Sequence, residues 1–286
     1  MNNTQATPKK HNPLAQWFRQ PKIYIQLPSK GKFYPTGSLD VSVNDEYAVY
    51  AMTAKDELML KTPDALMSGQ STVEVIKSCV PSIVNPWEMP SVDVDAVLLS
   101  IRVATYGENM EVSTNCPSCK EENTYNVNLL NWLSKLRNFN FSEIIDASPL
   151  TIHIKPYSYK ELSDTGLKSF EQQRLLSIIN DENITDSEKI EKFNESFVKL
   201  TELTVNTLAK CVWKIDTPDG EITDKDFITE FVEDAPKEVF DKISTQLSNI
   251  KEQMGFGNQE VTCTHCNHEF TMPIELDQSS FFVKGS

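Results

Sequence analysis

Two Cys-x-x-Cys pairs limit the possible folds of this chain more than any other feature. Cys116 and Cys119 form the first pair, and Cys263 and Cys266 form the second. Two thiolates three positions apart can bind one metal ion at tetrahedral angles, and a second such pair completes a four-thiolate site. Because 144 positions separate Cys119 from Cys263, a shared site requires the two ends of a long segment to meet. The spacing therefore predicts one structural zinc ion bound by these four cysteines.

The residues that follow each pair support this prediction. Counted from the first cysteine of each pair, the same three positions, nine, eleven and thirteen residues on, are hydrophobic: Tyr125, Val127 and Leu129 after the first pair, and Met272, Ile274 and Leu276 after the second. Alternation with a period of two is typical of a strand with one buried face. We therefore expect a split zinc ribbon, with one half in residues 111–129 and the other in residues 259–277.

Other readings of the cysteines are less well supported. A thioredoxin-like redox motif follows a βα unit, and neither pair stands in that position. His265 and His268 could replace a thiolate, but four cysteines already fill a tetrahedral shell, so these histidines are expected outside it. The remaining cysteines, Cys79 and Cys211, lie in apolar helical contexts and are predicted to be buried.

The N-terminal region, residues 23–110, is predicted to begin rich in β-structure and then to turn helical. Ile23–Leu27 is strand-like, and residues 39–43 and 46–50 alternate on either side of Asn44-Asp45, which predicts a hairpin. Ser71 and Glu74 have capping-box spacing. One further apolar helix face, ended by Gly107, is formed by Val94, Val97, Leu98 and Ile101.

Residues 130–258 are predicted to form a long, mainly helical insertion. Capping boxes at Ser158 and Thr185, and Pro236, mark three helix starts, and residues 212–220 suggest a small hairpin. The apolar stripes of the first two helices are expected to face the core: Leu162, Leu167, Phe170, Leu175 and Ile178 in one, and Ile190, Phe193, Phe197 and Leu200 in the other. The predicted class is α+β, divided into a basic N-terminal arm (1–22), an N-terminal β/α region (23–110), the split ribbon (111–129 and 259–277), the insertion (130–258) and a C-terminal tail (278–286).

Charge is distributed unevenly along the chain. The sequence has 27 basic and 41 acidic side chains, a formal net charge of −14, yet residues 1–32 carry six positive charges and no acid. Mostly acidic residues surround the cysteine pairs, so phosphates would be repelled there and nucleic acid is an unexpected partner. No apolar run approaches the length of a membrane span, and the start lacks the h-region of a signal peptide. We expect a protein of the reducing cytosol with no membrane partner.

The sequence motifs favour an interaction protein over an enzyme. Gly-x-Ser-x-Gly, His-Glu-x-x-His and Gly-x-Gly-x-x-Gly are absent, and a closed four-thiolate shell leaves no open coordination position. A zinc-ribbon protein that binds nucleic acid remains as an alternative, and a metal-dependent or redox enzyme as a third hypothesis.

Three groups of apolar residues are candidates for partner binding. Leu14, Trp17 and Phe18 form a short stripe in the basic arm, Phe33 and Tyr34 lie in a turn-rich segment, and Phe281 and Phe282 lie near the C-terminus. The alternatives are that Phe33 and Tyr34 pin their own loop, and that both terminal arms fold back on the protein's own core.

Several motifs resemble those of the baseplate-hub assembly proteins of contractile-tailed, myovirus-type bacteriophages. The resemblance spans about residues 23–282, and it is carried by Leu27-Pro28-Ser29-Lys30-Gly31-Lys32-Phe33-Tyr34-Pro35, Met52-Thr53, Asp56-Glu57, Lys61-Thr62-Pro63-Asp64-Ala65-Leu66, Gly69, Cys79-Val80, Asp95, Arg102, Tyr106-Gly107, Cys116-Pro117-Ser118-Cys119, Lys155-Pro156-Tyr157-Ser158-Tyr159-Lys160-Glu161-Leu162, Glu171-Gln172-Gln173-Arg174, His268-Glu269-Phe270 and Ser280-Phe281-Phe282.

This resemblance implies a protein that helps to build the hub of a phage tail baseplate, with hub or tail proteins as partners and no catalytic residues. It places the protein in the host bacterial cytoplasm during assembly. It leaves open whether the protein is a hub component that stays in the virion tail baseplate or an assembly chaperone that leaves, and what its oligomeric state is.

Overall fold

Helix α4 (Ser91–Tyr106) lies at the centre of the larger of the two hydrophobic cores that the described residues form. The computed structural model of the chain describes residues 13–14, 17–61, 68–178, 185–254, 258–273 and 282. Leu98 and Leu99, on different sides of α4, are both buried, and a helix that is apolar on most sides is stable only when other elements surround it. The α4 helix ends at Gly107, with φ 98°, as its sequence predicts.

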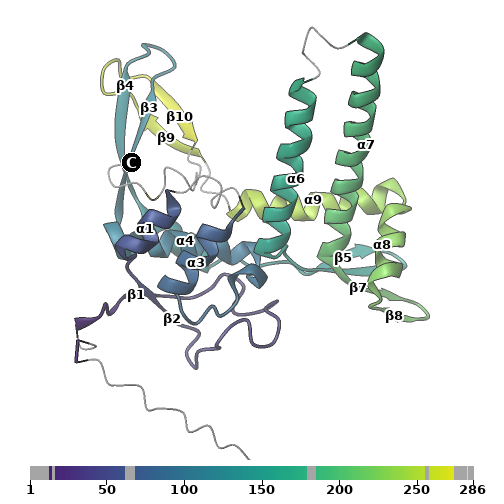
Figure 1. The fold of residues 1–286 in the computed structure, drawn as a ribbon, viewed down its shortest axis with the longest axis horizontal. Helices are drawn as coiled ribbons and strands as arrows, with labels where there is room; N and C mark the ends of the chain where they lie inside the picture. Colours follow the sequence, from purple (N-terminus) through teal and green to yellow (C-terminus); the bar gives the residue numbers. More distant parts are fainter. Residues whose placement is uncertain are drawn as a thin grey trace, which may run out of the picture.

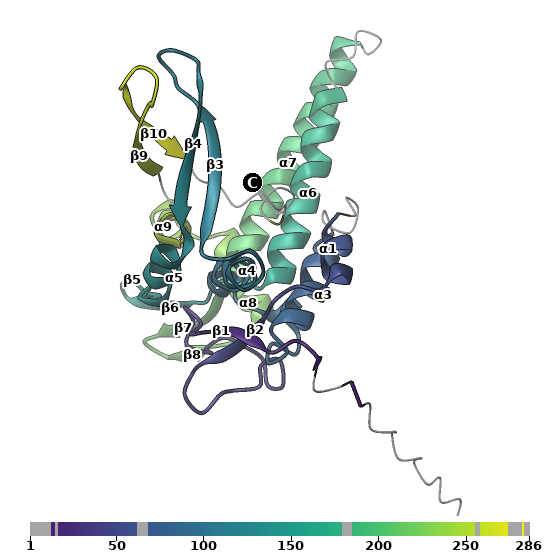
Figure 2. The same cartoon turned by 90° about the vertical axis from the view of Figure 1, so that its left-hand side faces the viewer.

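A two-stranded ribbon and short helices cover α4 on the N-terminal side (Figures 1 and 2). The ribbon pairs β1 with β2 in antiparallel orientation, with Ile25 opposite Tyr47. The elements of this region are β1 (Pro21–Ile25), β2 (Tyr47–Tyr50), α1 (Ala54–Leu60), α3 (Gln70–Cys79) and the 3₁₀ helix η2 (Pro86–Glu88).

The predicted hairpin between residues 39–43 and 46–50 is wrong. Tyr47–Tyr50 pairs with β1, and residues 39–43 form no strand. Only Leu39 reaches the core, whereas Val41 and Val43 are 74% and 101% exposed. β1 instead brings Ile25 into the same core as Tyr47 and Val49, so pairing with β1 buries apolar surface that the local hairpin would leave in water.

The predicted capping box at Ser71 is also wrong. Helix α3 begins two residues earlier than a cap at Ser71 would place it, after Gly69, which has a left-handed φ of 74° and makes no side-chain cap. The Ser71 hydroxyl donates to the Met59 carbonyl at 2.8 Å and so joins α3 to α1. A tertiary hydrogen bond has therefore taken the side chain that the sequence pattern assigns to the helix end.

Gly69 gives a stability prediction with an internal control. A β-carbon at Gly69 would lie 2.5 Å from Ser163 Oγ, and its backbone is left-handed, so Gly69→Ala should destabilise the fold by about 1–3 kcal/mol. Gly166 lies inside helix α6 with no atom within 4 Å of a built β-carbon. Gly166→Ala should therefore stabilise by roughly 0.5–1 kcal/mol. Chemical denaturation measures both; equal effects of the same sign would contradict the proposed crowding at Gly69.

The smaller core lies in the insertion, between a four-stranded sheet and three helices. Ile152 and Ile154 of the sheet pack with Ile228 and Ile243 of the helices. The strands run in the order β5-β6-β7-β8, all antiparallel, and the predicted hairpin at residues 212–220 is β7-β8. Its elements are β5 (Ile144–Ala147), β6 (Leu150–Ile154), β7 (Val212–Thr217), β8 (Gly220–Ile222), α7 (Asp186–Cys211), α8 (Lys225–Glu233) and α9 (Lys237–Met254). The predicted α+β class, with a helical insertion between the two cysteine pairs, is confirmed.

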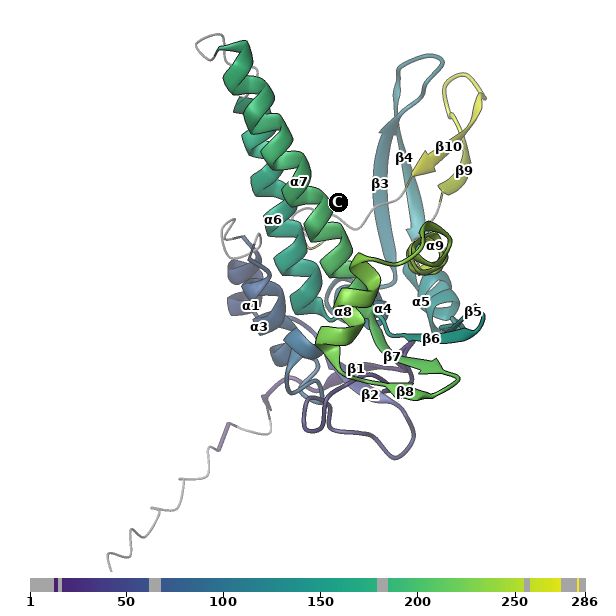
Figure 3. The ribbon, with the colours of Figure 1, turned by 90° about the vertical axis from the view of Figure 1, so that its right-hand side faces the viewer.

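Helices α6 (Tyr159–Ile178) and α7 form a long hairpin that projects from the body in all three views (Figures 1, 2 and 3). Both predicted capping boxes are present. The Ser158 N–H donates to the Glu161 carboxylate at 2.8 Å, and the Thr185 N–H donates to Glu188 at 3.1 Å. No described helix combines the length and apolar character needed to cross a membrane.

The prediction that both apolar stripes of this hairpin face a core is wrong. The side chains that remain 40–63% exposed are Leu162, Phe170, Ile190, Phe193 and Phe197. Leu167 and Leu200 are half-buried, while the side chains of Leu175 and Ile178 lie outside the described part of the chain. The helical period is correct, but the hairpin extends past the body and no described element covers these residues.

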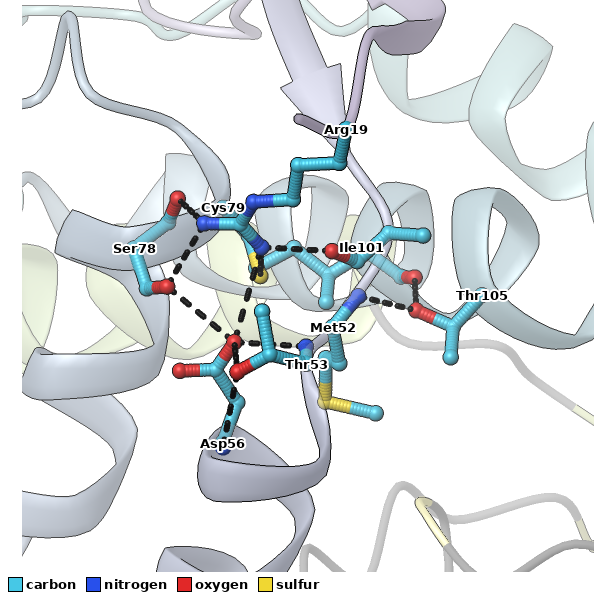
Figure 4. Close-up of polar contacts among 9 residues, drawn as sticks. Arg19, Met52, Thr53, Asp56, Ser78, Cys79, Ile101 and Thr105 are labelled. Carbon is cyan, nitrogen blue, oxygen red and sulfur yellow. Dashed lines mark hydrogen bonds and ion pairs between the residues drawn. The ribbon is translucent and has the colours of Figure 1, made fainter. Parts of the chain in front are cut away.

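Arg19 fastens the N-terminal segment to the body (Figure 4). Its guanidinium donates to the Ala51 carbonyl at 2.5 Å, to the Ser78 carbonyl and to the Ser78 hydroxyl at 2.7 Å. It also lies 3.5 Å from the Asp56 carboxylate and 5.6 Å from the centre of the Tyr50 ring. The predicted basic arm is therefore attached at Arg19; residues 1–12 and 15–16 lie outside the described residues.

Candidate metal centre

The two Cys-x-x-Cys pairs lie in the turns of two β-hairpins that stand side by side (Figures 1, 2 and 3). Cys116 directly follows β3, and Cys263 directly follows β9. Val127 and Met272, each 1% exposed, anchor the two hairpins in the larger core, as their alternating pattern predicts. The strands are β3 (Asn109–Asn115), β4 (Glu122–Asn128), β9 (Asn258–Thr262) and β10 (Glu269–Pro273), and α5 (Leu129–Arg137) follows β4.

The two turns have the same backbone geometry. In each, the first cysteine, Cys116 or Cys263, donates its N–H to the carbonyl five residues on, at 2.9 Å in both turns. The carbonyl of the same cysteine accepts from the N–H four residues on, in Lys120 or Asn267. These two residues have left-handed φ values of 66° and 57°. The sequence repeat around the cysteines is therefore a structural repeat.

The four sulfur atoms have the spacing of a tetrahedral metal site. Cys116 Sγ lies 3.7 Å from Cys266 Sγ, and Cys119 Sγ lies 3.6 Å from Cys263 Sγ. All four lie within 4.8 Å of one another. Metal–sulfur bonds of 2.3 Å at tetrahedral angles would place the sulfurs about 3.8 Å apart, whereas a disulfide requires about 2.05 Å. The four cysteines therefore lie close enough to hold one metal ion.

Asn123 joins the two halves of the centre and was missed by the sequence analysis. Its side-chain amide donates to Cys263 Sγ at 3.4 Å, and its carbonyl oxygen accepts from the Thr264 N–H and hydroxyl, both at 2.8 Å. It is 2% exposed. The signal was present, because Asn123 precedes Tyr125 and Val127 by two and four positions and so shares their face of the strand.

Hydrogen-bond donors favour the thiolate at Cys263. Burial alone would raise the pKa of this thiol, but the N–H groups of Cys266 and His265, the Asn123 amide and the Cys119 thiol together lower the pKa to about 6. The thiolate is the form of cysteine that binds metal. His265 and His268 do not belong to the metal-ligand group found among the described residues. Cys79 and Cys211 are both fully buried, as predicted.

The other predicted site residues lie away from this centre. Trp17 and Phe18 are 76% and 58% exposed, and Leu14 is 61% exposed. Phe33 packs edge-on against Phe141, with ring centres 5.4 Å apart. These positions leave partner binding by the arm and by Phe33 as predictions.

Tyr34 has a structural role in its loop. Its hydroxyl donates to the Asp93 carboxylate at 2.9 Å, and the Ser29 N–H and hydroxyl donate to the same carboxylate at 2.7 and 2.6 Å. Burial raises the pKa of Asp93 to about 6 although all three donors lower it. The turn at residues 27–35 is thus held to α4, which is the loop-pinning alternative, and docking by Tyr34 stays a prediction.

Phe282, a predicted partner-binding residue of the C-terminal tail, is buried. This residue is 7% exposed within the larger core, and its carbonyl accepts from the Tyr106 hydroxyl at 3.0 Å. This position supports the fold-back alternative for Phe282, because burying the apolar ring in the protein's own core is favourable. Partner binding by the tail stays a prediction. Phe281 lies outside the described residues.

Comparison with protein families matches residues 20–283 to one family, described as T4 bacteriophage base plate protein. No curated protein and no solved structure matches the chain significantly. The matched range includes the N-terminal ribbon, both cysteine turns and the whole insertion between them. Because that match covers nearly the whole chain, this chain belongs to the T4 bacteriophage base plate protein family.

Proposed function

We propose that this chain acts without catalysis in the assembly of the phage tail baseplate hub, either as a hub component or as an assembly chaperone. The observation that carries the proposal is the match to the base plate family over residues 20–283. Exposed apolar groups on the arm and on the α6–α7 hairpin support a protein that binds other proteins, since large exposed apolar patches are typical of interaction sites. Assembly would take place in the host cytoplasm.

A purification from infected cells tests this proposal. An affinity-tagged copy should retain hub or tail proteins of the phage after washing, and mass spectrometry identifies them. Purified virions then separate the two roles, because a hub component remains in the particle and a chaperone does not. Retention of no phage tail protein at any stage of infection would contradict a role in assembly.

We further propose that the four cysteines bind zinc, as a structural ion. Four thiolates at tetrahedral spacing suit Zn²⁺, and a full set of protein ligands leaves no position for a substrate or a reactive water. Its contribution would be to hold together two hairpins that lie 144 positions apart in the chain. The alternative of nucleic-acid binding lacks support in charge: residues 108–128 and 258–273 contain six glutamates and one lysine. Salt-sensitive DNA binding by the purified protein would favour that alternative.

Asn123 should affect zinc affinity without being a ligand. Asn123→Ala removes the donor to Cys263 Sγ and the acceptor for Thr264, and loss of such a supporting partner weakens metal binding by about 10- to 100-fold. Competition with a chromophoric chelator measures the affinity. Asn126→Ala, an exposed change on the same strand, is the control and should leave the affinity unchanged. Equal affinities of the two variants would remove Asn123 from the site.

A further inference from the structure

Helix α7 carries an apolar stripe that the described residues leave uncovered. Ile190, Phe193 and Phe197 are 63%, 52% and 62% exposed. Their spacing of three and four residues places them on one side of the helix, because each residue turns the chain by about 100°. On α6, Leu162 and Phe170 are 40% and 50% exposed. Half of the large apolar side chains that the described part of the hairpin exposes therefore lie in this one stripe on α7.

Charge is excluded from this stripe. From Glu188 to Glu202, every charged residue except the half-buried Lys189 lies more than about 100° around α7 from the centre of the stripe. Glu195 and Lys199 pair with each other at 2.6 Å on that other side. Apart from Lys189, the residues next to the stripe are uncharged: Asn194, Thr201 and Thr204. A partner that docks on the stripe is thus met by apolar and neutral groups.

These features fit a second copy of the same chain. Each copy carries a net charge of −14, so two copies repel one another wherever charged faces meet, and an uncharged face is where they can approach. Two antiparallel helices with one uncovered apolar face are half of a four-helix bundle, which a second hairpin completes. The hairpin projects far enough for another to lie against it (Figures 1 and 3).

We propose that two copies pair their α6–α7 hairpins about a two-fold axis into a four-helix bundle. The stripe Ile190, Phe193, Phe197 and the half-buried Leu200 has spacings of three, four and three, which read the same in both directions. In an antiparallel pairing, Phe193 of each copy therefore lies beside Phe197 of the other. This self-complementarity is what a two-fold contact requires.

The available surface suits a reversible dimer. A phenylalanine can bury about 150–250 Å², so the half-exposed side chains of the stripe and of Phe170 offer roughly 400–500 Å² per copy. Two copies together would bury roughly 800–1,000 Å². This area lies at the lower limit of specific interfaces, about 1,000 Å² in total, where weak and transient contacts are found. We therefore expect a concentration-dependent dimer of the purified chain, which needs no phage partner and stands independently of the proposed role in the baseplate.

Sedimentation velocity of the full-length protein over about a hundredfold range of concentration tests the proposal. The wild type should shift from monomer to dimer as its concentration rises. The double variant Phe193→Glu/Phe197→Glu should stay monomeric over this range, because its dimer dissociation constant is expected to be at least tenfold larger than that of the wild type. Val198→Glu is the matched control, because Val198 is 53% exposed on the same helix but points about 100° away from Phe197. It should dimerise like the wild type.

Two further measurements keep the test decisive. Circular dichroism and metal content should be the same in all three proteins, which excludes unfolding as the cause of dissociation. A photoreactive benzoylphenylalanine at position 197 should cross-link to the segment 190–200 of a second copy. A wild type that is monomeric throughout, a double variant that still dimerises, or cross-links only within one chain, such as to its own N-terminal arm, would each overturn the proposal.

Discussion

Replacing Cys263 with serine is expected to cause the largest loss of stability of any single change in this chain. Cys263 is fully buried and accepts hydrogen bonds from Asn123 and from the His265 N–H, so its sulfur is fixed in place for a metal ion. Structural zinc contributes binding free energy directly to folding, about 10–16 kcal/mol in small zinc peptides at neutral pH. Losing one of four thiolates should remove on the order of 5 kcal/mol of this. Chemical denaturation with elemental analysis measures both effects.

Cys211→Ser provides the control for this substitution. Cys211 is also fully buried, but it lies at the end of α7, away from the four-cysteine group. The Cys211 variant should keep about one zinc per chain and lose less stability. A wild-type protein that contains no zinc when purified in reducing buffer would contradict the metal assignment, and equal metal content in the two variants would contradict the ligand set.

Asp56→Ala is expected to produce the second large effect. One oxygen of this 3%-exposed carboxylate accepts from the Thr53 N–H at 2.7 Å and from the Ser78 hydroxyl at 3.1 Å, and lies 3.5 Å from Arg19 (Figure 4). Removal leaves the Thr53 N–H and the Ser78 hydroxyl without this acceptor, and Arg19 without its acidic partner, in a mostly buried site, at a cost of about 3 kcal/mol. The melting temperature should fall by roughly 5–10 °C, as calorimetry can measure.

Lys55→Ala is the neighbouring control, because Lys55 is exposed in the same turn of α1. Its effect should stay within about 0.5 kcal/mol. The effect of Arg19→Ala should also shrink when Asp56 is already alanine, because the two side chains share one network. If the two substitutions were fully additive, Arg19 and Asp56 would not act together.

Local sequence patterns predicted where α6 and α7 begin, but not which of their apolar side chains are buried. The capping boxes at Ser158 and Thr185 formed as predicted, because each needs only residues within one turn of helix. The stripe with Phe193 and Phe197 has the predicted helical period but faces outward. Period depends on the chain's own geometry, whereas burial depends on whether another element lies opposite.

Two misses at the N-terminal half have the same cause. Tyr47–Tyr50 pairs with β1 and not with residues 39–43, which are nearer in the sequence. The Ser71 hydroxyl donates to the Met59 carbonyl and does not cap α3. In each case a contact distant in sequence buries more apolar surface, or satisfies a buried polar group better, than the local pattern could.

The α+β class, the four cysteines of the candidate metal centre and the starts of the two long helices were predictable from the amino-acid sequence, because spacing and capping chemistry act over a few residues. How distant segments pack in three dimensions was needed to show that Asn123 joins the two cysteine turns, that Phe282 is buried and that the α6–α7 hairpin projects with an apolar stripe that the described residues leave uncovered. These outcomes depend on which segments, distant in the sequence, pack together (Figure 1). The spacing of residues along a helix or strand does not specify which element lies against its apolar face.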